Sequence, residues 1–192
     1  MTARFTSPAP QEMTEEQQAI YALFATGRRA RPGNPFSLVD ASGRLQGPPA
    51  AWVLAPPLGR ALEQLGGAVR YELTLPARAS EIAILMVAHH YRSPFELYAH
   101  TRAGAAAGLS PDDLGALAAG QPPALTTQAE RVTYAVTRAV LTDGTLDDEQ
   151  YAQAAGVLGA GQLFELTTLI GWYSMVAVQL AVFGLMPPGE PR

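Results

Sequence analysis

Helix start signals recur along this chain of 192 residues and limit the folds that it can form. Five segments begin with Ser, Thr or Asp in a position to cap a helix N-terminus: residues 14–17, 93–96, 110–113, 127–130 and 147–150. The first two also complete a capping box, in which the third helical residue reaches back to the cap. Few segments alternate apolar and polar residues as a half-buried strand does. The sequence therefore predicts an all-α fold, a helical bundle of about seven or eight helices.

The expected helix boundaries follow from these caps and from the Gly and Pro residues that end helices. They predict helices over residues 14–26, 58–71 with an interruption at Gly66-Gly67, 76–90, 93–107, 110–119, 127–141, 147–158 and 162–184. Residues 27–50 are rich in Pro and Gly, so we expect an irregular segment there, a candidate loop over a binding site. We expect residues 1–13 to be a flexible tail and residues 14–186 to form one helical domain.

Two of the predicted helices are unusually apolar. The helix over residues 76–90 is apolar on every side from Ile82 to Ala88, which is typical of a helix that is buried all round. The last predicted helix is similar, and in a chain of this size two such helices suggest a homo-oligomer. The last helix is also long enough to span a membrane. Because it carries polar residues such as Glu165 and Gln179, we expect a core or interface helix instead.

The composition excludes several kinds of chemistry. The chain has no Cys and no Lys, which excludes disulfides, thiolate nucleophiles, Cys-ligated metals and lysine Schiff bases. A net charge of −4 without a basic stripe or a polybasic cluster argues against nucleic acid and anionic lipid as partners. The N-terminus has no long apolar segment, so we expect no secretory signal and a cytoplasmic protein. Catalysis must rest on Glu, Asp, His, Tyr, Ser, Arg or a bound cofactor.

The side chains best suited to catalysis lie close together in the sequence. Glu96 and His100 are four residues apart, so they share one face of a helix, and Ser93 lies one turn before Glu96. A carboxylate one turn from an imidazole can hold that ring in one tautomer. The alternative is that Ser93 and Glu96 only cap the helix. A metal site from His90, Glu96 and His100 has suitable ligand types, but its spacing matches no known zinc pattern, so we expect no metal.

Glu81 lies in the apolar helix predicted over residues 76–90. Desolvation is expected to raise the pKa of its carboxyl group, which would suit a proton relay near neutral pH. The alternative is a Glu in the first helical turn that points to water and interacts with the helix dipole. Nearby, Arg92 is a candidate for binding a substrate carboxylate through two hydrogen bonds.

The ordered set Glu81, Ser93, Glu96 and His100 resembles the carboxymuconolactone decarboxylase-like and AhpD-like superfamily. The redox branch of that superfamily has a Cys-x-x-Cys pair where this chain has Ser93 and Glu96. The decarboxylase branch has Glu-x-x-x-His, which residues 96–100 match. The resemblance extends over roughly residues 50–183 and includes His90-Tyr91, Phe95-Glu96, Gly108-Leu109-Ser110 and residues 169–173.

The resemblance implies an AhpD-like fold, assembly into trimers or hexamers, and an enzyme. The expected activity is that of a cofactor-independent carboxy-lyase acting on a small carboxylated lactone such as 4-carboxymuconolactone, in the β-ketoadipate pathway of aromatic catabolism. The alternative is a non-catalytic small-molecule-binding or oligomeric module of the same fold, and a thiol peroxidase is disfavoured because there is no Cys. The expected catalytic residues are His100, Glu96 and Glu81, and the expected substrate-binding residues are His90, Ser93, Arg92 and Tyr173.

Overall fold

A computed structural model describes residues 4–27 and 37–189 of the chain. These residues contain eight α-helices and one short 3-10 helix, and their only β pairing is an isolated bridge between Val39 and Leu45. The all-α prediction is therefore confirmed. The chain divides into two compact units, one made of the residues up to Ala68 and from Val178 onward, the other of Val69–Ala177. A single domain over residues 14–186 stays a prediction.

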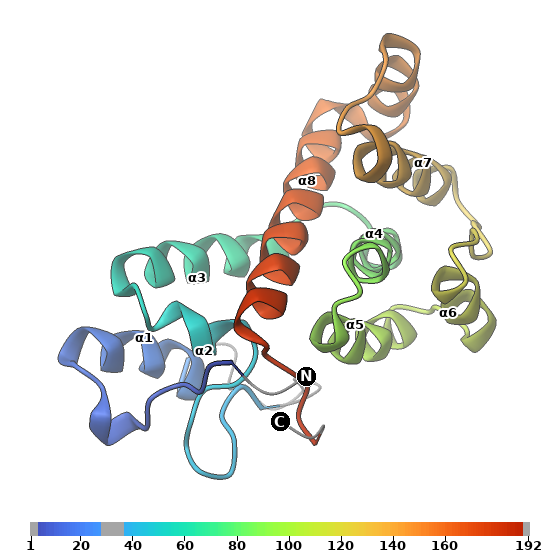
Figure 1. The fold of residues 1–192 in the computed structure, drawn as a ribbon. Helices are drawn as coiled ribbons and strands as arrows, with labels where there is room; N and C mark the ends of the chain where they lie inside the picture. The colour runs from blue at the N-terminus through green and yellow to red at the C-terminus, as the bar shows by residue number, and fades with distance from the viewer. Residues whose placement is uncertain (1–3, 28–36, 190–192) are drawn as a thin grey trace. The chain divides into compact units, whose positions relative to one another are not determined.

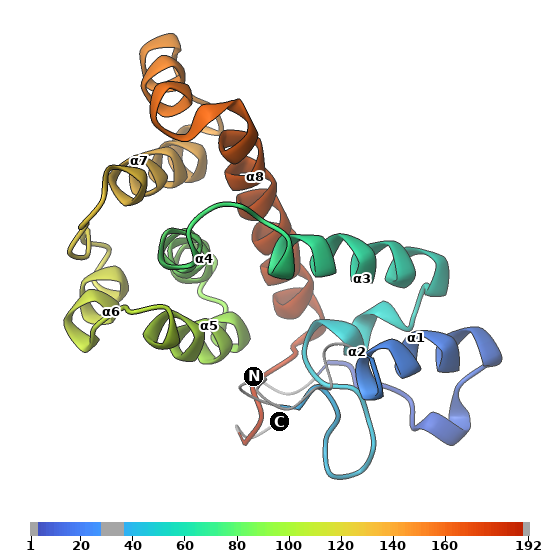
Figure 2. The same cartoon turned by 180° about the vertical axis from the view of Figure 1, so that it is seen from behind.

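The first unit contains the 3-10 helix Pro10–Glu12 and the helices α1 (Glu15–Ala25) and α2 (Pro48–Trp52) (Figure 2). The hydroxyl of Thr14 accepts a hydrogen bond from the backbone N–H of Gln17, and the Gln17 side chain accepts one from the Thr14 N–H. The capping box predicted here is therefore confirmed. Helices α1 and α2 meet through the rings of Phe24 and Trp52, whose centroids are 5.7 Å apart.

The two non-helical segments expected near the N-terminus differ from the sequence prediction in detail. Residues 28–36, which fall in the predicted irregular segment over residues 27–50, lie outside the described part of the chain. Helix α2 begins inside that segment, at Pro48. In the expected flexible tail, the side chains of Ser7, Ala9 and Met13 are buried. Whether the tail is flexible stays a prediction, but its described residues contribute to the packing of the first unit.

Helix α3 (Pro56–Tyr71) runs without a break through Gly66 and Gly67, so the predicted interruption is wrong. A glycine inside a helix costs only about 1 kcal/mol relative to alanine. The buried side chains of Leu62 and Val69, one turn to either side, contribute more than that through burial. Tertiary packing therefore outweighs the local propensity.

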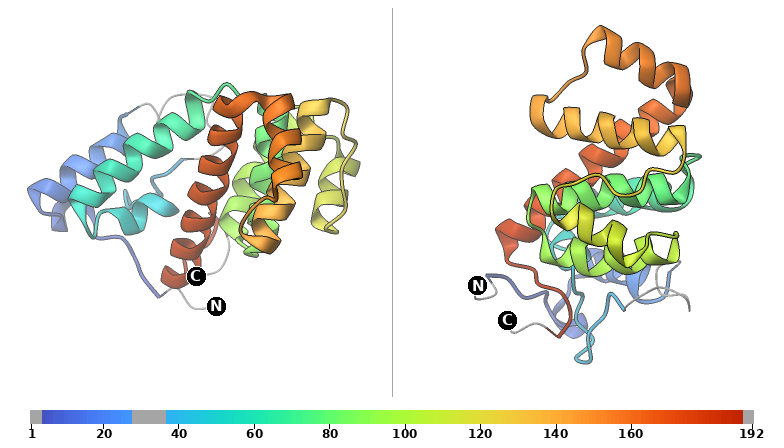
Figure 3. Two further views of the ribbon diagram at one scale, coloured as in Figure 1. Left: turned by 90° about the horizontal axis from the view of Figure 1, so that it is seen from above. Right: turned by 90° about the vertical axis from the view of Figure 1, so that its right-hand side faces the viewer.

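The second unit is built around α4 (Ala77–His90). Helix α4 contacts α5 (Pro94–Ala106), α6 (Pro111–Ala118) and α7 (Gln128–Asp143), and it lies between α5 and α7 (Figures 1 and 3). Its apolar side chains are buried, as the sequence predicts, and they include Ile82, Ile84, Leu85 and Val87. Because helices of the same chain pack around α4, its apolar surface needs no second subunit, and the homo-oligomer stays a prediction.

The two helices predicted over residues 147–158 and 162–184 form one element, α8 (Asp148–Phe183), with a kink. The kink is at Gly159, which has φ 72° and ψ 161°. This backbone conformation is accessible almost only to glycine, because a Cβ would clash with the backbone. Helix α8 is long and apolar enough to cross a membrane, with 44% of its most apolar window buried, but core helices of globular proteins pass the same test of length and composition. It is therefore weak evidence for a membrane span.

Arg78 of α4 fastens α4 to the helices around it. Its guanidinium group donates to Glu130 at 2.6 Å, to Asp113 at 3.0 Å, and to the backbone carbonyls of Gly108 and Ala124. The carboxylates of Asp113 and Glu130 are buried. Hydrogen bonds from the backbone N–H of Ser110 and other donors, Arg78 among them, hold the pKa of Asp113 at about 2. All of these groups are paired, so the cluster is a structural one.

Replacing Arg78 by Met is expected to destabilise the chain by about 3 kcal/mol, because two buried carboxylates then lose their shared cation. Urea unfolding at neutral pH measures the change. The matched control is Arg102→Met, which should cost less than about 1 kcal/mol, since Arg102 is exposed on α5 and its interactions with described residues are those with Tyr98, one turn earlier. Equal losses in the two variants would show that the Arg78 cluster does not hold the helices together.

Candidate active site

A largely buried line of side chains joins the end of α3 to α4, α5 and α8 in the second unit. Oε1 of Glu81, on α4, accepts a hydrogen bond from Nη1 of Arg70 at 3.0 Å. Oε2 of Glu81 is 2.8 Å from Nδ1 of His100, on α5. The ring of Tyr173, on α8, meets the His100 ring edge to face, with centroids 4.8 Å apart and planes at 86°. The side chains of Glu81, His100 and Tyr173 are all buried.

Glu81 takes this position because α4 begins at Ala77, which places Glu81 beyond the first helical turn. The alternative reading, a first-turn Glu that points to water, is therefore wrong. In a helix whose other side chains are mostly apolar, a buried carboxylate needs partners. Arg70, from the last turn of α3, and His100 supply them.

The charge state of Glu81 differs from the sequence prediction. Burial by itself raises the pKa of Glu81, but the hydrogen bond from His100 and the positive charge of Arg70 outweigh it, so the pKa is lowered below the usual value. The expectation of a raised pKa considered desolvation alone and is wrong. Glu81 is therefore an ionised carboxylate at neutral pH.

His100 is the neutral member of the pair. Burial lowers the pKa of its imidazole, and the nearby charge of Arg70 lowers it further, against the opposing effect of Glu81. With Glu81 ionised, Nδ1 must carry the ring proton and donate a hydrogen bond to Oε2. This tautomer leaves a lone pair on Nε2, so His100 is arranged as a base.

The capping box predicted over residues 93–96 does not form. Ser93 is the N-cap of α5, but its side chain makes no capping hydrogen bond. The Ser93 hydroxyl and both carboxyl oxygens of Glu96 are buried, and none of them has a hydrogen-bond partner among residues 4–27 and 37–189. The predicted pairing of Glu96 with His100 is also wrong, since His100 pairs with Glu81 across helices.

The burial of Glu96, which is only 2% exposed, changes its chemistry. Desolvation raises the pKa of Glu96 to about 8, and the neighbouring Ser93 hydroxyl, which lies close without normal hydrogen-bond geometry, only partly opposes the rise. Glu96 is therefore a neutral carboxylic acid at pH 7. The site contains two carboxyl groups in opposite states, an arrangement that separates a proton donor from a base in acid–base enzymes.

The remaining predicted site residues are placed differently. His90 and Arg92 are exposed at the end of α4, and His90 stacks edge to face on Tyr91 with centroids 4.9 Å apart. In the part of the chain that the structure describes, no contact connects either residue with His100. Their role in substrate binding stays a prediction. Tyr173 lies against His100, and it also interacts with Arg70.

Arg70 is the site residue that the sequence analysis missed. It lies in the last turn of a helix with no motif, eleven residues before Glu81. A hint was available in the isolated charge near the end of an amphipathic helix, but only the folded chain connects it with Glu81. No three His, Asp or Glu side chains in the described ranges are arranged to hold a metal ion.

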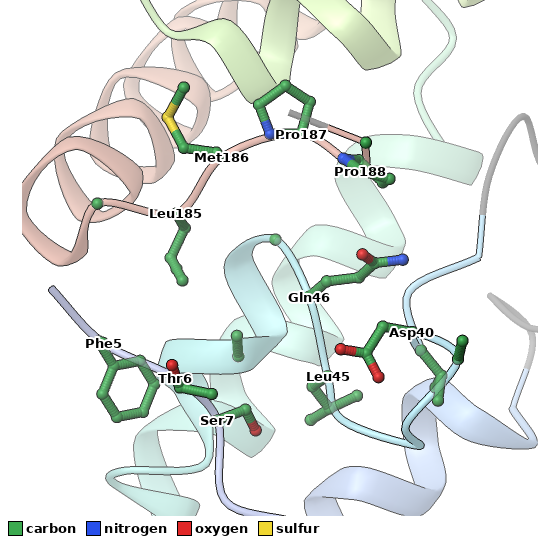
Figure 4. Close-up of a pocket in the computed structure, with 16 residues that line it drawn as sticks. Phe5, Thr6, Ser7, Asp40, Leu45, Gln46, Leu185, Met186, Pro187 and Pro188 are labelled. Carbon is green, nitrogen blue, oxygen red and sulfur yellow. The ribbon is translucent and has the colours of Figure 1, made fainter. Parts of the chain in front are cut away.

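A cavity lies in the first unit and is shown in Figure 4. The cavity has a volume of about 350 Å³ and is lined by Phe5, Leu45 and Leu185, among others. Its acidic residue, Asp40, uses Oδ1 to accept hydrogen bonds from Ser42 and Arg44 within its own loop. None of the predicted site residues lines this cavity.

The fold and the site together define an all-α protein with a buried carboxylate–imidazole pair and a second, protonated carboxyl group. Residues 56–139 match the model of the carboxymuconolactone decarboxylase family, which supports the resemblance to the carboxymuconolactone decarboxylase-like and AhpD-like superfamily. The matched range contains Arg70, Glu81, Ser93, Glu96 and His100. No curated protein matches the chain at a significant level.

Proposed function

We propose that this protein is a cofactor-independent carboxy-lyase that acts on a small carboxylated lactone such as 4-carboxymuconolactone. The observation that carries the proposal is a pair of buried carboxyl groups in different surroundings, since Glu81 is paired with the imidazole of His100 whereas Glu96 has no hydrogen-bond partner among the described residues. The match of residues 56–139 to the decarboxylase family supports it. Glu96 supplies the acid, and the Glu81–His100 pair supplies the base.

The reaction needs an ionised substrate and a proton donor at the same pH. The bond between the substrate carboxylate and its carbon breaks, CO₂ leaves, and the electron pair moves through the conjugated system to the lactone carbonyl as an oxyanion. A proton is then added to carbon. The substrate serves as its own electron sink, so the proposed chemistry involves no cofactor.

Each group of the site has a role in this scheme. The neutral carboxyl group of Glu96 gives its proton to carbon. The Ser93 hydroxyl, which has no partner within the described chain, donates a hydrogen bond to the oxyanion, an interaction that can contribute about 3 kcal/mol. His100 takes a proton from solvent on Nε2 and returns it to Glu96, while Glu81 stabilises the imidazolium that forms.

A decarboxylation assay on 4-carboxymuconolactone tests the proposal, with substrate loss and CO₂ release followed together. We expect turnover without added metal or cofactor, and a rate that falls above about pH 8 as Glu96 ionises. A chain that is stabilised against heat by carboxylated lactones but releases no CO₂ is a binding module, which is the alternative function. That result would overturn the proposed activity.

A further inference from the structure

Arg70 has no direct contact with His100 but is connected to it through one residue. Its Nη1 atom is 3.0 Å from one oxygen of Glu81, and Nδ1 of His100 is 2.8 Å from the other oxygen. One carboxylate oxygen of Glu81 thus bonds to the guanidinium group of Arg70, which is always charged, and the other bonds to the imidazole of His100, which can titrate. Arg70 is the most exposed of the three residues. Its side chain is 29% exposed, compared with 9% for Glu81 and 8% for His100.

The charges of this line determine which protonation state is favourable. With Arg70 and Glu81 ionised and His100 neutral, the three groups sum to zero. Protonation of His100 would add a net positive charge to a largely buried site, which is costly unless an unpaired anion is present. If Arg70 were absent, Glu81 would be that unpaired anion, and it would favour a charged imidazole in its place.

The other titratable groups around His100 do not replace Arg70. Tyr173, on α8, meets the imidazole of His100 in an edge-to-face ring contact. Glu96 lies one turn earlier on α5 and is protonated at neutral pH. Glu81 from α4 is the only ionised carboxylate that pairs with His100 in the described part of the chain. Among these groups, Arg70 is the one that offsets the charge of Glu81.

We propose that Arg70 is a positioning residue that keeps His100 a neutral base. By pairing with Glu81, it lets Glu81 accept a hydrogen bond from Nδ1–H of His100 without favouring a second proton on Nε2. The effect on catalysis rests on the proposed function, whereas the state of the imidazole does not. Arg70 therefore acts on the site through Glu81 and touches no substrate.

The test is ¹⁵N nuclear magnetic resonance of the histidine rings in the full-length chain, which has three histidines. The His100 signal is assigned with the double variant His89→Gln/His90→Gln, which leaves one histidine. In the natural sequence we expect the neutral Nδ1–H tautomer at neutral pH. In Arg70→Met, the imidazole of His100 should bind its second proton at least about tenfold more tightly. The reason is that the positive charge of Arg70, which is connected with His100 through Glu81, has been removed.

Arg70→Lys serves as the matched control, because it keeps the positive charge and should keep His100 neutral. If Arg70 only anchored α3 to α4, Arg70→Met would lower stability but leave the titration of His100 unchanged, and that result would overturn the proposal. If Arg70→Met does not fold, the natural chain and Arg70→Lys can still contradict the proposal. A doubly protonated His100 at neutral pH in either protein would contradict it.

The activity measurement is separate from the spectroscopic one. If the protein is a decarboxylase, Arg70→Met should shift the acid limb of the kcat/KM profile to higher pH, and lower the rate at pH 7 about tenfold with little change in KM. Activity lost equally at every pH would contradict the positioning role. A natural chain without turnover on lactones would refute the proposed function, while the ring spectra would still test Arg70.

Discussion

The Glu96→Gln variant is expected to be several kcal/mol more stable than the natural chain at about pH 8.5, and similar to it at about pH 4.5. The reason is the raised pKa of Glu96, about 8 in the folded chain against the ordinary value of 4.5. Between these two pH values the unfolded chain has released the Glu96 proton, while the folded chain still holds it. Stability is therefore fully present below the unfolded pKa and is lost as the pH rises toward 8.

The magnitude follows from the width of this pH window. The loss is roughly 1.4 kcal/mol per pH unit, or about 5 kcal/mol over the whole window. A glutamine of nearly the same shape does not ionise, so the variant avoids the loss. Its amide still has to fit beside Ser93, where no partner exists among the described residues, and this makes the gain at high pH somewhat smaller.

Urea unfolding of both chains across this pH range measures the effect. The control is Glu149→Gln, since Glu149 is an exposed carboxylate at the start of α8. Its difference from the natural chain should be small and should depend little on pH. Parallel pH profiles of stability for the natural chain and Glu96→Gln would mean that Glu96 is not a buried acid.

The Glu96→Gln variant should also lose about 10²- to 10⁴-fold in turnover, because the proton donor is gone.

The His100→Ala variant is expected to abolish turnover while the chain still folds. The loss of the base should lower kcat about 10²- to 10⁴-fold. Glu81 keeps its ion pair with Arg70 at 3.0 Å, so no buried carboxylate is left unpaired. The variant loses the packing of the imidazole against Tyr173, which should cost about 2 kcal/mol.

Two matched variants separate chemistry from folding. His90→Ala removes the same side chain from an exposed position ten residues earlier and should leave kcat unchanged. His100→Asn keeps an N–H that can donate to Glu81 but has no basic nitrogen, so it should fold as the natural chain does and remain inactive. Full activity in either His100 variant would refute the assignment of the base.

The sequence predicted the helices well because helix starts are encoded locally. Thr14 and Gln17 form their capping box, and Ser110 and Thr127 also cap α6 and α7 through their side chains. The prediction failed where a local signal competed with packing. Gly66-Gly67 did not interrupt α3, and Ser93 did not cap α5 through its hydroxyl, although both positions carried the expected residues.

The candidate site, like the helices, was predicted from the sequence only in part. By itself the sequence determined the fold class, the family resemblance and the residue types, and it brought Glu81, Glu96 and His100 to attention through their spacing. Only the tertiary structure decided that Glu81 pairs with His100, that Arg70 joins them, and that Glu96 is buried as a neutral acid. The physical reason is that helix caps depend on neighbours within four residues, whereas a pKa depends on desolvation and on charges brought close through space.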